Sequence, residues 1–182
     1  LWLAYAIANP PEPGSQLVLR SRDGSTQRQF TQTKDAEDVC PVFVGQDLIW
    51  TRHSQGRCEL MKQALLGDTP QGLAACAALR SCPDISSDGN QLLYTARATD
   101  DRHGNGLAVL NLRSGESAPL TAPTLSEGDD IDPRFSPHGT VSYVRGAIGT
   151  QSLWQVALTA NAKPRRAALV DSMIFGHAYL PD

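Results

Sequence analysis

The sequence contains two blocks of the same design, DPRFSPHGTVSYVRG (132–146) and CPDISSDGNQLLYTAR (82–97). Each block passes from a Pro and an apolar residue into a Gly turn, and then into an alternating apolar strand. Ser-Asp-Gly and Pro-His-Gly are turn sequences, because Pro presets φ, short polar side chains cap the backbone and Gly accepts positive φ. A third, degraded copy is CPVFVGQDLIWTR (40–52), with Gly45 at the turn. Each block therefore predicts a β-hairpin.

Large aromatic residues recur in the apolar runs with a nearly constant period. They lie 45, 44 and 49 residues apart, at Tyr5, Trp50, Tyr94 and Tyr143. Self-similarity at such a period is the signature of a repeat architecture. We expect these four rings to pack between neighbouring repeats, because one small sheet cannot bury both of its faces alone.

A second hairpin completes each repeat. The segments LVLRSRDGSTQRQFT (17–31) and LAVLNLRSGESAPLT (107–121) both contain a strand, a Gly turn and a further strand. The repeat is thus expected to hold four antiparallel strands, A to D, and tandem units of this size are the blades of a β-propeller. A β-sandwich remains an alternative, since the turn spacing alone would suit one. Only residues 65–81 are apolar enough for a helix, and Pro70 with two glycines argues against it.

The expected fold class is all-β, a β-propeller of four-stranded antiparallel blades. Residues 1–182 are expected to form a single propeller region. The blade-like repeats fall at roughly 1–31, 40–76, 82–121 and 132–170, with 176–182 starting a further hairpin. About four repeats are present, and we expect the region to be part of a larger propeller, with a self-closed four-bladed ring as the alternative.

The composition excludes several classes of function. The formal net charge of −3 gives no basic surface for a phosphate backbone, so we expect no nucleic acid to contact this region. No run of about 18 apolar residues is present, and we therefore expect no membrane span in this region. Hydrophobic content of 41% and charged content of 19% are those of a globular protein.

Four cysteines lie in the first half of the chain, and their spacing lacks the paired knuckles of a zinc site. They are Cys40, Cys58, Cys76 and Cys82. An even number in a β-rich chain favours two disulfides and an oxidising compartment, with free buried thiols as the alternative. Cys58 and Cys76 flank one hairpin symmetrically about Gly67, so we favour this pair, which leaves Cys40 with Cys82. The rival set, Cys40–Cys58 with Cys76–Cys82, stays open at this point.

The repeat blocks resemble those of TolB-type propellers, relatives of WD-repeat blades whose motif reads Asp-Pro-x-aromatic-Ser-Pro-Asp-Gly. The last complete block matches at six positions: Asp132, Pro133, Phe135, Ser136, Pro137 and Gly139. The preceding block matches at four: Pro83, Ser86, Asp88 and Gly89. His138 replaces Asp in the first case, whereas Cys82 and Ser87 replace Asp and Pro in the second. The resemblance implies a fold more strongly than a function, because functional sites are built onto folds.

TolB-type repeats occur in periplasmic interaction proteins and as sensory halves of membrane-anchored winged-helix transcription regulators. The resemblance therefore implies a non-enzymatic platform that binds or senses a protein partner or a small-molecule ligand over the propeller end. Together with the expected disulfides, it implies an extracytoplasmic location, the bacterial periplasm. The alternative is the propeller domain of a prolyl-oligopeptidase-like serine peptidase.

Acidic residues concentrate in two loops, ATDDRHGNG (98–106) and SEGDDIDP (126–133). In a blade these loops would meet at one end, forming a candidate binding rim. Its members are Asp100, Asp101, His103, Glu127, Asp129, Asp130 and Asp132. Clustered carboxylates focus a negative potential, so this rim could bind a cation or a basic peptide segment. The competing interpretation is a solvated loop whose carboxylates cap the local backbone. We expect no resident cofactor.

No catalytic constellation is recognisable in the sequence. His53, His103, His138 and His177 are too scattered to form a metal motif. The turn serines lack the Gly-x-Ser-x-Gly sequence that surrounds a hydrolase nucleophile. We therefore expect no catalytic residue, no metal site and no enzymatic activity.

Overall fold

Every regular element of the described chain is a β-strand, and none is a helix. The computed structural model describes residues 1–8, 14–67, 69–77, 81–147, 149–159, 162–172, 174 and 177. The chain divides into two compact units, Leu1–Ala78 (unit 1) and Leu79–Asp182 (unit 2), which we describe separately. The predicted all-β class is therefore confirmed, and residues Gln71–Cys76 within the helix-like stretch form a strand.

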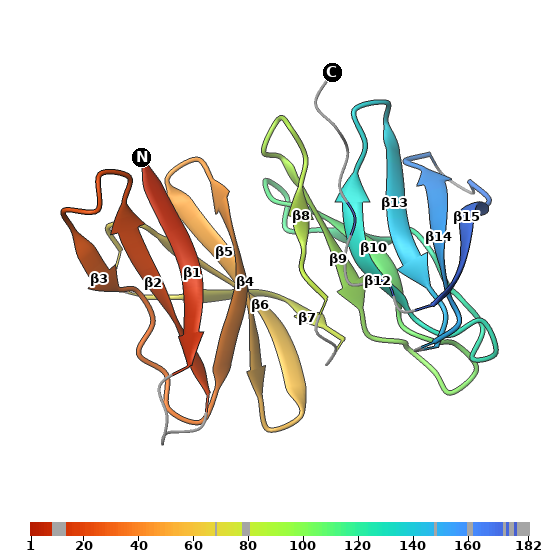
Figure 1. The fold of residues 1–182 in the computed structure, drawn as a ribbon, viewed down its shortest axis with the longest axis horizontal. Helices are drawn as coiled ribbons and strands as arrows, with labels where there is room; N and C mark the ends of the chain where they lie inside the picture. The colour runs from red at the N-terminus through yellow and green to blue at the C-terminus, as the bar shows by residue number, and fades with distance from the viewer. Residues whose placement is uncertain are drawn as a thin grey trace. The chain divides into compact units, whose positions relative to one another are not determined.

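The seven strands of unit 1 form one hydrogen-bonded sheet that divides into two blade-like groups, which follow one another in the chain (Figure 1). Blade 1 is formed by β1 (Trp2–Ala8), β2 (Ser15–Ser21) and β3 (Gln27–Gln29). Blade 2 is formed by β4 (Glu37–Val44), β5 (Asp47–Ser54), β6 (Arg57–Ala64) and β7 (Gln71–Cys76). Neighbours within each blade are antiparallel, and one parallel bridge between Ser15 and Glu37 connects the two blades.

Unit 2 contains two four-stranded antiparallel sheets. Blade 3 is formed by β8 (Asp84–Ile85), β9 (Gln91–Ala96), β10 (Gly106–Asn111) and β11 (Ser117–Pro119). Blade 4 is formed by β12 (Asp130–Phe135), β13 (Thr140–Arg145), β14 (Gln151–Ala157) and β15 (Arg165–Ser172). These four strands correspond to the expected order A to D. The further hairpin expected at 176–182 lies outside the described residues, apart from His177.

The first strand of blades 2 and 4 carries the same β-bulge. Cys40 and Asp132 both adopt the left-handed region, with φ of 55° and 49°, and each precedes a Pro. The pairing register shifts at both places, between Val39 and Val42 and across the Asp132-Pro133 step. A bulge bends the strand and redirects its side chains. As a result β4 begins at Glu37, three residues before the predicted start of blade 2 at Cys40.

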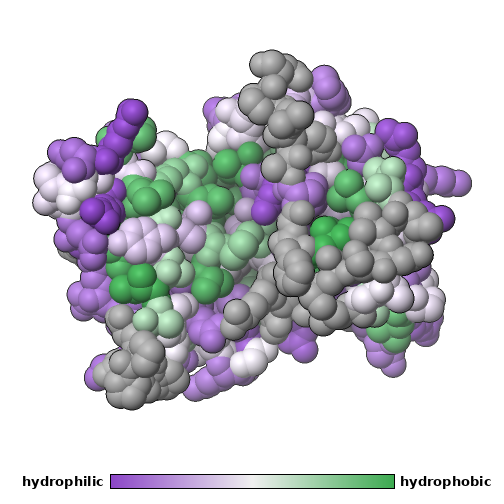
Figure 2. Space-filling view, in the orientation of Figure 1, coloured by the Kyte–Doolittle hydropathy of each residue, from purple (hydrophilic) through white to green (hydrophobic). Residues whose placement is uncertain are grey.

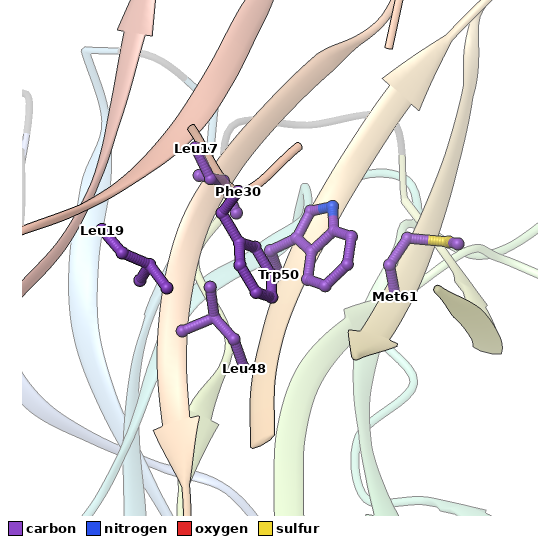
Figure 3. Close-up of a cluster of buried hydrophobic side chains, with 6 residues drawn as sticks. All are labelled: Leu17, Leu19, Phe30, Leu48, Trp50 and Met61. Atoms are coloured by element: carbon purple, nitrogen blue, oxygen red, sulfur yellow. The ribbon is translucent and has the colours of Figure 1, made fainter. Parts of the chain in front are cut away.

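The core of unit 1 lies between blades 1 and 2 (Figure 3). Trp50 from β5 is fully buried and packs edge-to-face against Phe30, with ring centroids 5.8 Å apart. Such an aromatic pair contributes about 0.5–1.5 kcal/mol beyond the area it buries. The remaining members of this cluster come from both blades: Leu17, Leu19, Leu48 and Met61. Tyr5, in contrast, is only half-buried, and its hydroxyl bonds to Gln27.

The core of unit 2 has the same organisation. Tyr143 from β13 is fully buried and packs with Leu93 and Leu107 of blade 3. Tyr94 is also buried, and its hydroxyl lies 2.8 Å from Ser117 Oγ within blade 3. Trp50 and Tyr143 thus pack with residues of the preceding blade, whereas the hydroxyls of Tyr5 and Tyr94 bond within their own blades.

Exposed apolar side chains collect at the start of unit 1 (Figure 2). Leu1 and Leu3 are 92% and 58% exposed, and Trp2 is 37% exposed. No helix of the described residues is long and apolar enough to cross a membrane.

Candidate functional site

The two acidic loops of unit 2 meet directly, at the end of blades 3 and 4 where the sequence places the rim. The backbone N–H of Gly104 donates to the carbonyl of Pro123, and the backbone N–H of Asp130 donates to the carbonyl of Asn105, both at 2.9 Å. A Cβ on Gly104 would lie 2.5 Å from the carbonyl oxygen of Gly128, which is closer than real Cβ contacts come. Glycine at this position is therefore required for the loops to approach.

Two of the acidic residues accept hydrogen bonds from the backbone of the 98–106 loop. Asp129 accepts hydrogen bonds from the backbone N–H and the side-chain amide of Asn105, at 2.7 and 3.0 Å. Asp100 accepts one from the N–H of Arg102, and His103 Nδ1 lies 2.8 Å from it. The hydrogen bond from His103 lowers the pKa of Asp100. These contacts agree with the interpretation of a solvated loop whose carboxylates cap the nearby backbone.

Asp130 is fully buried in a clamp with Arg145. Arg145 donates from Nε and Nη2 to the two carboxylate oxygens, at 2.6 and 2.8 Å. Thr121, at the connection from blade 3, donates its hydroxyl to the same carboxylate at 2.5 Å. Burial raises the pKa of Asp130, and the hydrogen bonds from Arg145 and Thr121 oppose that rise. Asp130 is therefore used structurally, and its complete burial keeps it out of reach of a ligand.

Asp132 has different neighbours from the other rim residues. Its backbone N–H donates to Ser81 Oγ at 3.0 Å, and its carboxylate accepts from the backbone of Cys82. Burial raises the pKa of Asp132, while the charges of Arg134 and His177 oppose the rise. His177 in turn lies with Nε2 2.6 Å from Ser142 Oγ. Asp132 thus belongs to a separate cluster around β12 and β13.

Glu127 lines a cavity of about 240 Å³ in this rim. Its Oε2 accepts hydrogen bonds from the N–H and hydroxyl of Thr124, and its Oε1 accepts one from Arg145 Nη1 at 3.0 Å. These bonds, led by those from Thr124, lower the pKa of Glu127. Leu125 and Trp154 supply apolar parts of the wall.

Arg145 stacks on aromatic rings within this site. Its guanidinium carbon lies 4.9 Å from the ring centroid of Trp154 and 5.5 Å from that of Tyr143. Cation–π contacts of this kind stabilise a buried guanidinium. The Tyr143 hydroxyl is buried and has no hydrogen-bond partner among the described residues, and burial raises the pKa of Tyr143.

Blade 2 repeats the buried clamp with different donors. Asp38 accepts Arg52 Nε and Nη2 at 2.7 and 2.9 Å, the indole N–H of Trp50 at 2.9 Å and the Thr33 hydroxyl at 2.8 Å. A cleft of about 390 Å³ lies at the corresponding end, lined in part by Asp35. Asp35 and Glu127 each stand three residues before the buried carboxylate. Blades 2 and 4 thus each have a cleft at this end, and Trp154 lines only the cleft in blade 4.

Arg52, Arg145 and Trp154 were not among the site residues predicted from the sequence. A signal was present, because Arg52 and Arg145 each follow the repeat aromatic by two residues, in WTR and YVR. The partner Asp stands two residues before Cys40-Pro41 or Asp132-Pro133. Trp154 pairs with Tyr143 across the strands as Met61 pairs with Trp50 and Ala108 with Tyr94, but neither of those residues is aromatic.

The turn residues of the motif act on the local backbone. Asp88 accepts the Ser86 hydroxyl at 2.6 Å and the backbone N–H of Asn90 at 3.1 Å. These hydrogen bonds lower the pKa of Asp88 to about 2. Gly89 and Gly139 have φ of 69° and 70°, as their turns require. Among the described residues, no group of three or more His, Cys, Asp or Glu side chains is arranged to hold a metal ion.

Cys58 and Cys76 form a disulfide across β6 and β7, with 4.9 Å between their Cα atoms. This is the pair favoured by the sequence, and it rules out the rival set. No cysteine among the described residues is free. The expected partnership of Cys40 with Cys82 stays a prediction.

Solved structures with similar folds are β-propeller proteins. TolB from Acinetobacter baumannii matches with a TM-score of 0.71 and 17% identity, over 91% of this chain and 41% of TolB. A puromycin-hydrolyzing peptidase of Mycobacterium tuberculosis matches with a TM-score of 0.72 and 17% identity, over 100% of this chain and 28% of the peptidase. An oligogalacturonate lyase in complex with manganese matches with a TM-score of 0.68 and 14% identity, over 92% and 49%.

These similarities define the class: the chain has a TolB-type β-propeller fold. It spans less than half the length of each of these three proteins, as expected for part of a larger propeller. No family model and no curated protein matches the sequence.

Proposed function

We propose that this propeller region is a non-enzymatic binding or sensing platform that engages a partner at the rim of blade 4. The observation that carries this proposal is the cavity beside Trp154. It combines an aromatic wall, the exposed apolar Leu125 and a carboxylate that is 43% exposed. Recognition sites typically join apolar surface to a few fixed polar groups.

We further propose an extracytoplasmic location, the bacterial periplasm. The Cys58–Cys76 disulfide supports it, because such bonds persist in oxidising compartments and are rare in the cytosol. The fold similarity to TolB is consistent with that setting.

Photo-cross-linking tests the platform. A benzoylphenylalanine at Leu125, which is 62% exposed, is expected to form an adduct with a discrete partner in the cells that make the protein. The matched control carries the same group at Leu66, which is 93% exposed at the turn after β6 and does not line the rim cavity. Adducts at both positions alike, or at neither, would overturn the proposal.

A second candidate is the propeller domain of a serine peptidase. It is favoured by the similarity of the whole chain to the puromycin-hydrolyzing peptidase. The parent gene discriminates between the two candidates: a Gly-x-Ser-x-Gly hydrolase domain supports the peptidase, and a winged helix followed by a membrane span supports the sensor.

A further inference from the structure

We propose that the cavity beside Trp154 is a socket for one basic side chain, Lys or Arg, presented by a protein partner. This inference rests on the platform function and specifies its chemistry. Four independent features of the cavity support it: charge, exposure, wall chemistry and size.

The charges at the cavity favour a cation. The guanidinium of Arg145 is matched by the bidentate Asp130 carboxylate, so the Glu127 carboxylate is left in excess. The side chain of Arg145 is only 7% exposed, whereas that of Glu127 is 43% exposed. An approaching ligand therefore meets the carboxylate first. Asp129, next to Gly128 in the same loop, adds a further negative charge.

The Glu127 carboxylate is held in place for this role. The N–H and hydroxyl of Thr124 fix one of its oxygens, at 2.8 and 2.9 Å, and Arg145 fixes the other. A carboxylate has about four acceptor positions, two on each oxygen. Oε2 already accepts two hydrogen bonds from Thr124, whereas Oε1 accepts only one, so Oε1 keeps capacity for an ammonium or guanidinium donor. A prearranged acceptor of this kind reduces the ordering cost of binding.

The walls suit the aliphatic stem of a long basic side chain. Trp154 and the exposed Leu125 line the cavity, and stems of Lys and Arg pack along apolar surface while their charged heads stay near water. The volume of about 240 Å³ is below the roughly 300–1,000 Å³ of small-molecule pockets. It therefore fits a single side chain better than a free ligand.

Two glycines shape the mouth of the cavity. Gly128 and Gly146 have φ of 82° and 125°. A Cβ on Gly128 would lie 2.9 Å from the carbonyl carbon of Gly146, and a Cβ on Gly146 would lie 2.7 Å from the Thr150 carbonyl oxygen. Larger residues at either position would strain the two loops that frame the socket.

The test is an NMR titration of the full ¹⁵N-labelled chain with capped pentapeptides Gly-Gly-X-Gly-Gly. With X as Lys or Arg, the amide signals of 125–128 and 150–152 and the indole N–H of Trp154 are expected to shift. The uncharged isostere norleucine and the Glu peptide are expected to bind at least several-fold more weakly. Equal binding of norleucine, preference for Glu, or no binding by any peptide would overturn the socket.

Two variants test whether the Glu127 carboxylate is the group that binds the basic side chain. Glu127→Gln keeps the shape and is expected to weaken Lys-peptide binding on the order of tenfold, as one charge-assisted contact would. Glu116→Gln removes the same charge from an exposed turn of blade 3 and is expected to leave the affinity unchanged. Equal affinities in both variants would contradict the proposal. Thermal melting checks that each variant is folded.

The cross-linking experiment separates the two proposals. If adducts form at Leu125 but the Lys peptide does not bind the protein with Glu127 intact, the platform stands and the basic-side-chain socket fails. If neither adduct nor peptide binding is observed, both fail.

Discussion

Trp50 donates its indole N–H to Oδ1 of Asp38 at 2.9 Å, inside blade 2. Tyr143, at the same position in blade 4, is equally buried, but its hydroxyl has no hydrogen-bond partner among the described residues. The two blades thus share a buried carboxylate clamp and differ in whether the aromatic ring takes part. The free energies of unfolding of variants at these two positions measure this difference.

Trp50→Phe is expected to destabilise the protein by roughly 2 kcal/mol. The substitution removes a donor from a buried carboxylate and leaves space in a core that includes Phe30 and Met61. Urea denaturation gives the free energy of unfolding. The control, Trp2→Phe on the exposed start of β1, is expected to change it by less than about 0.5 kcal/mol. Similar values for both variants would contradict the packing described for Trp50.

Tyr143→Phe is expected to be neutral or stabilising by up to about 1 kcal/mol, because it removes a buried polar atom that lacks a partner. Tyr94→Phe is the matched comparison, since the Tyr94 hydroxyl bonds to Ser117 at 2.8 Å. We expect that variant to lose about 0.5–1 kcal/mol. A clear loss in Tyr143→Phe, measured by the same denaturation, would show that its hydroxyl is bonded after all.

The cysteines are expected to resist alkylation in protein purified without reductant. Mass spectrometry of a non-reduced digest should recover the peptide of Cys58 linked to that of Cys76, and the peptide of Cys40 linked to that of Cys82. Replacing Cys58 and Cys76 together by Ala is expected to cost roughly 2–4 kcal/mol, because the bond closes a loop with a sequence separation of 18. Alkylated cysteine in the native protein would remove the support for an oxidising compartment.

His177 is expected to make stability pH-dependent. Burial lowers its pKa, aided by the charge of Arg134, while Ser142, Asp132 and Asp84 oppose the shift. The unfolded chain therefore binds more protons than the folded one between the lowered pKa and about 6.5. Stability should therefore rise with pH through that window and be lost as the pH falls through it, with no further loss from His177 below its lowered pKa.

Denaturation midpoints across this pH range test the expectation. His177→Gln retains a hydrogen-bonding group near Ser142 and is expected to flatten the rise. His138→Gln, at an exposed turn, should leave it unchanged. An NMR titration that gives His177 a pKa above 6.5 would refute the sign.

The sequence was sufficient to predict the fold because the repeats contain their own turn chemistry. Ser86, Asp88 and Gly89 determine a hairpin locally, and the period of Trp50 and Tyr143 determines which face is buried. Strand limits were less accurate, since the bulge at Cys40 extends β4 back to Glu37 in a way that alternation does not reveal.

The rim was predicted less well than the fold. Sequence proximity grouped Asp129, Asp130 and Asp132, although they reach three different environments. Asp129 precedes β12, and the bulge at Asp132 turns that residue away from the face it would share with Asp130 in a regular strand. Asp129 binds Asn105, Asp130 binds Arg145, and Asp132 lies toward His177. Trp154 was missed because the equivalent residues of the neighbouring repeats, Met61 and Ala108, are not aromatic and give no periodic signal.

The buried clamp has a consequence for how such proteins grow. Asp38 and Arg52 belong to one blade, and Thr33 belongs to the connection that leads into it. A gene duplication that copies 33–76 would therefore copy every partner of that carboxylate at once. The duplicated blade would contain both the buried carboxylate and the arginine that neutralises it. The array could therefore gain a blade without a compensating mutation elsewhere.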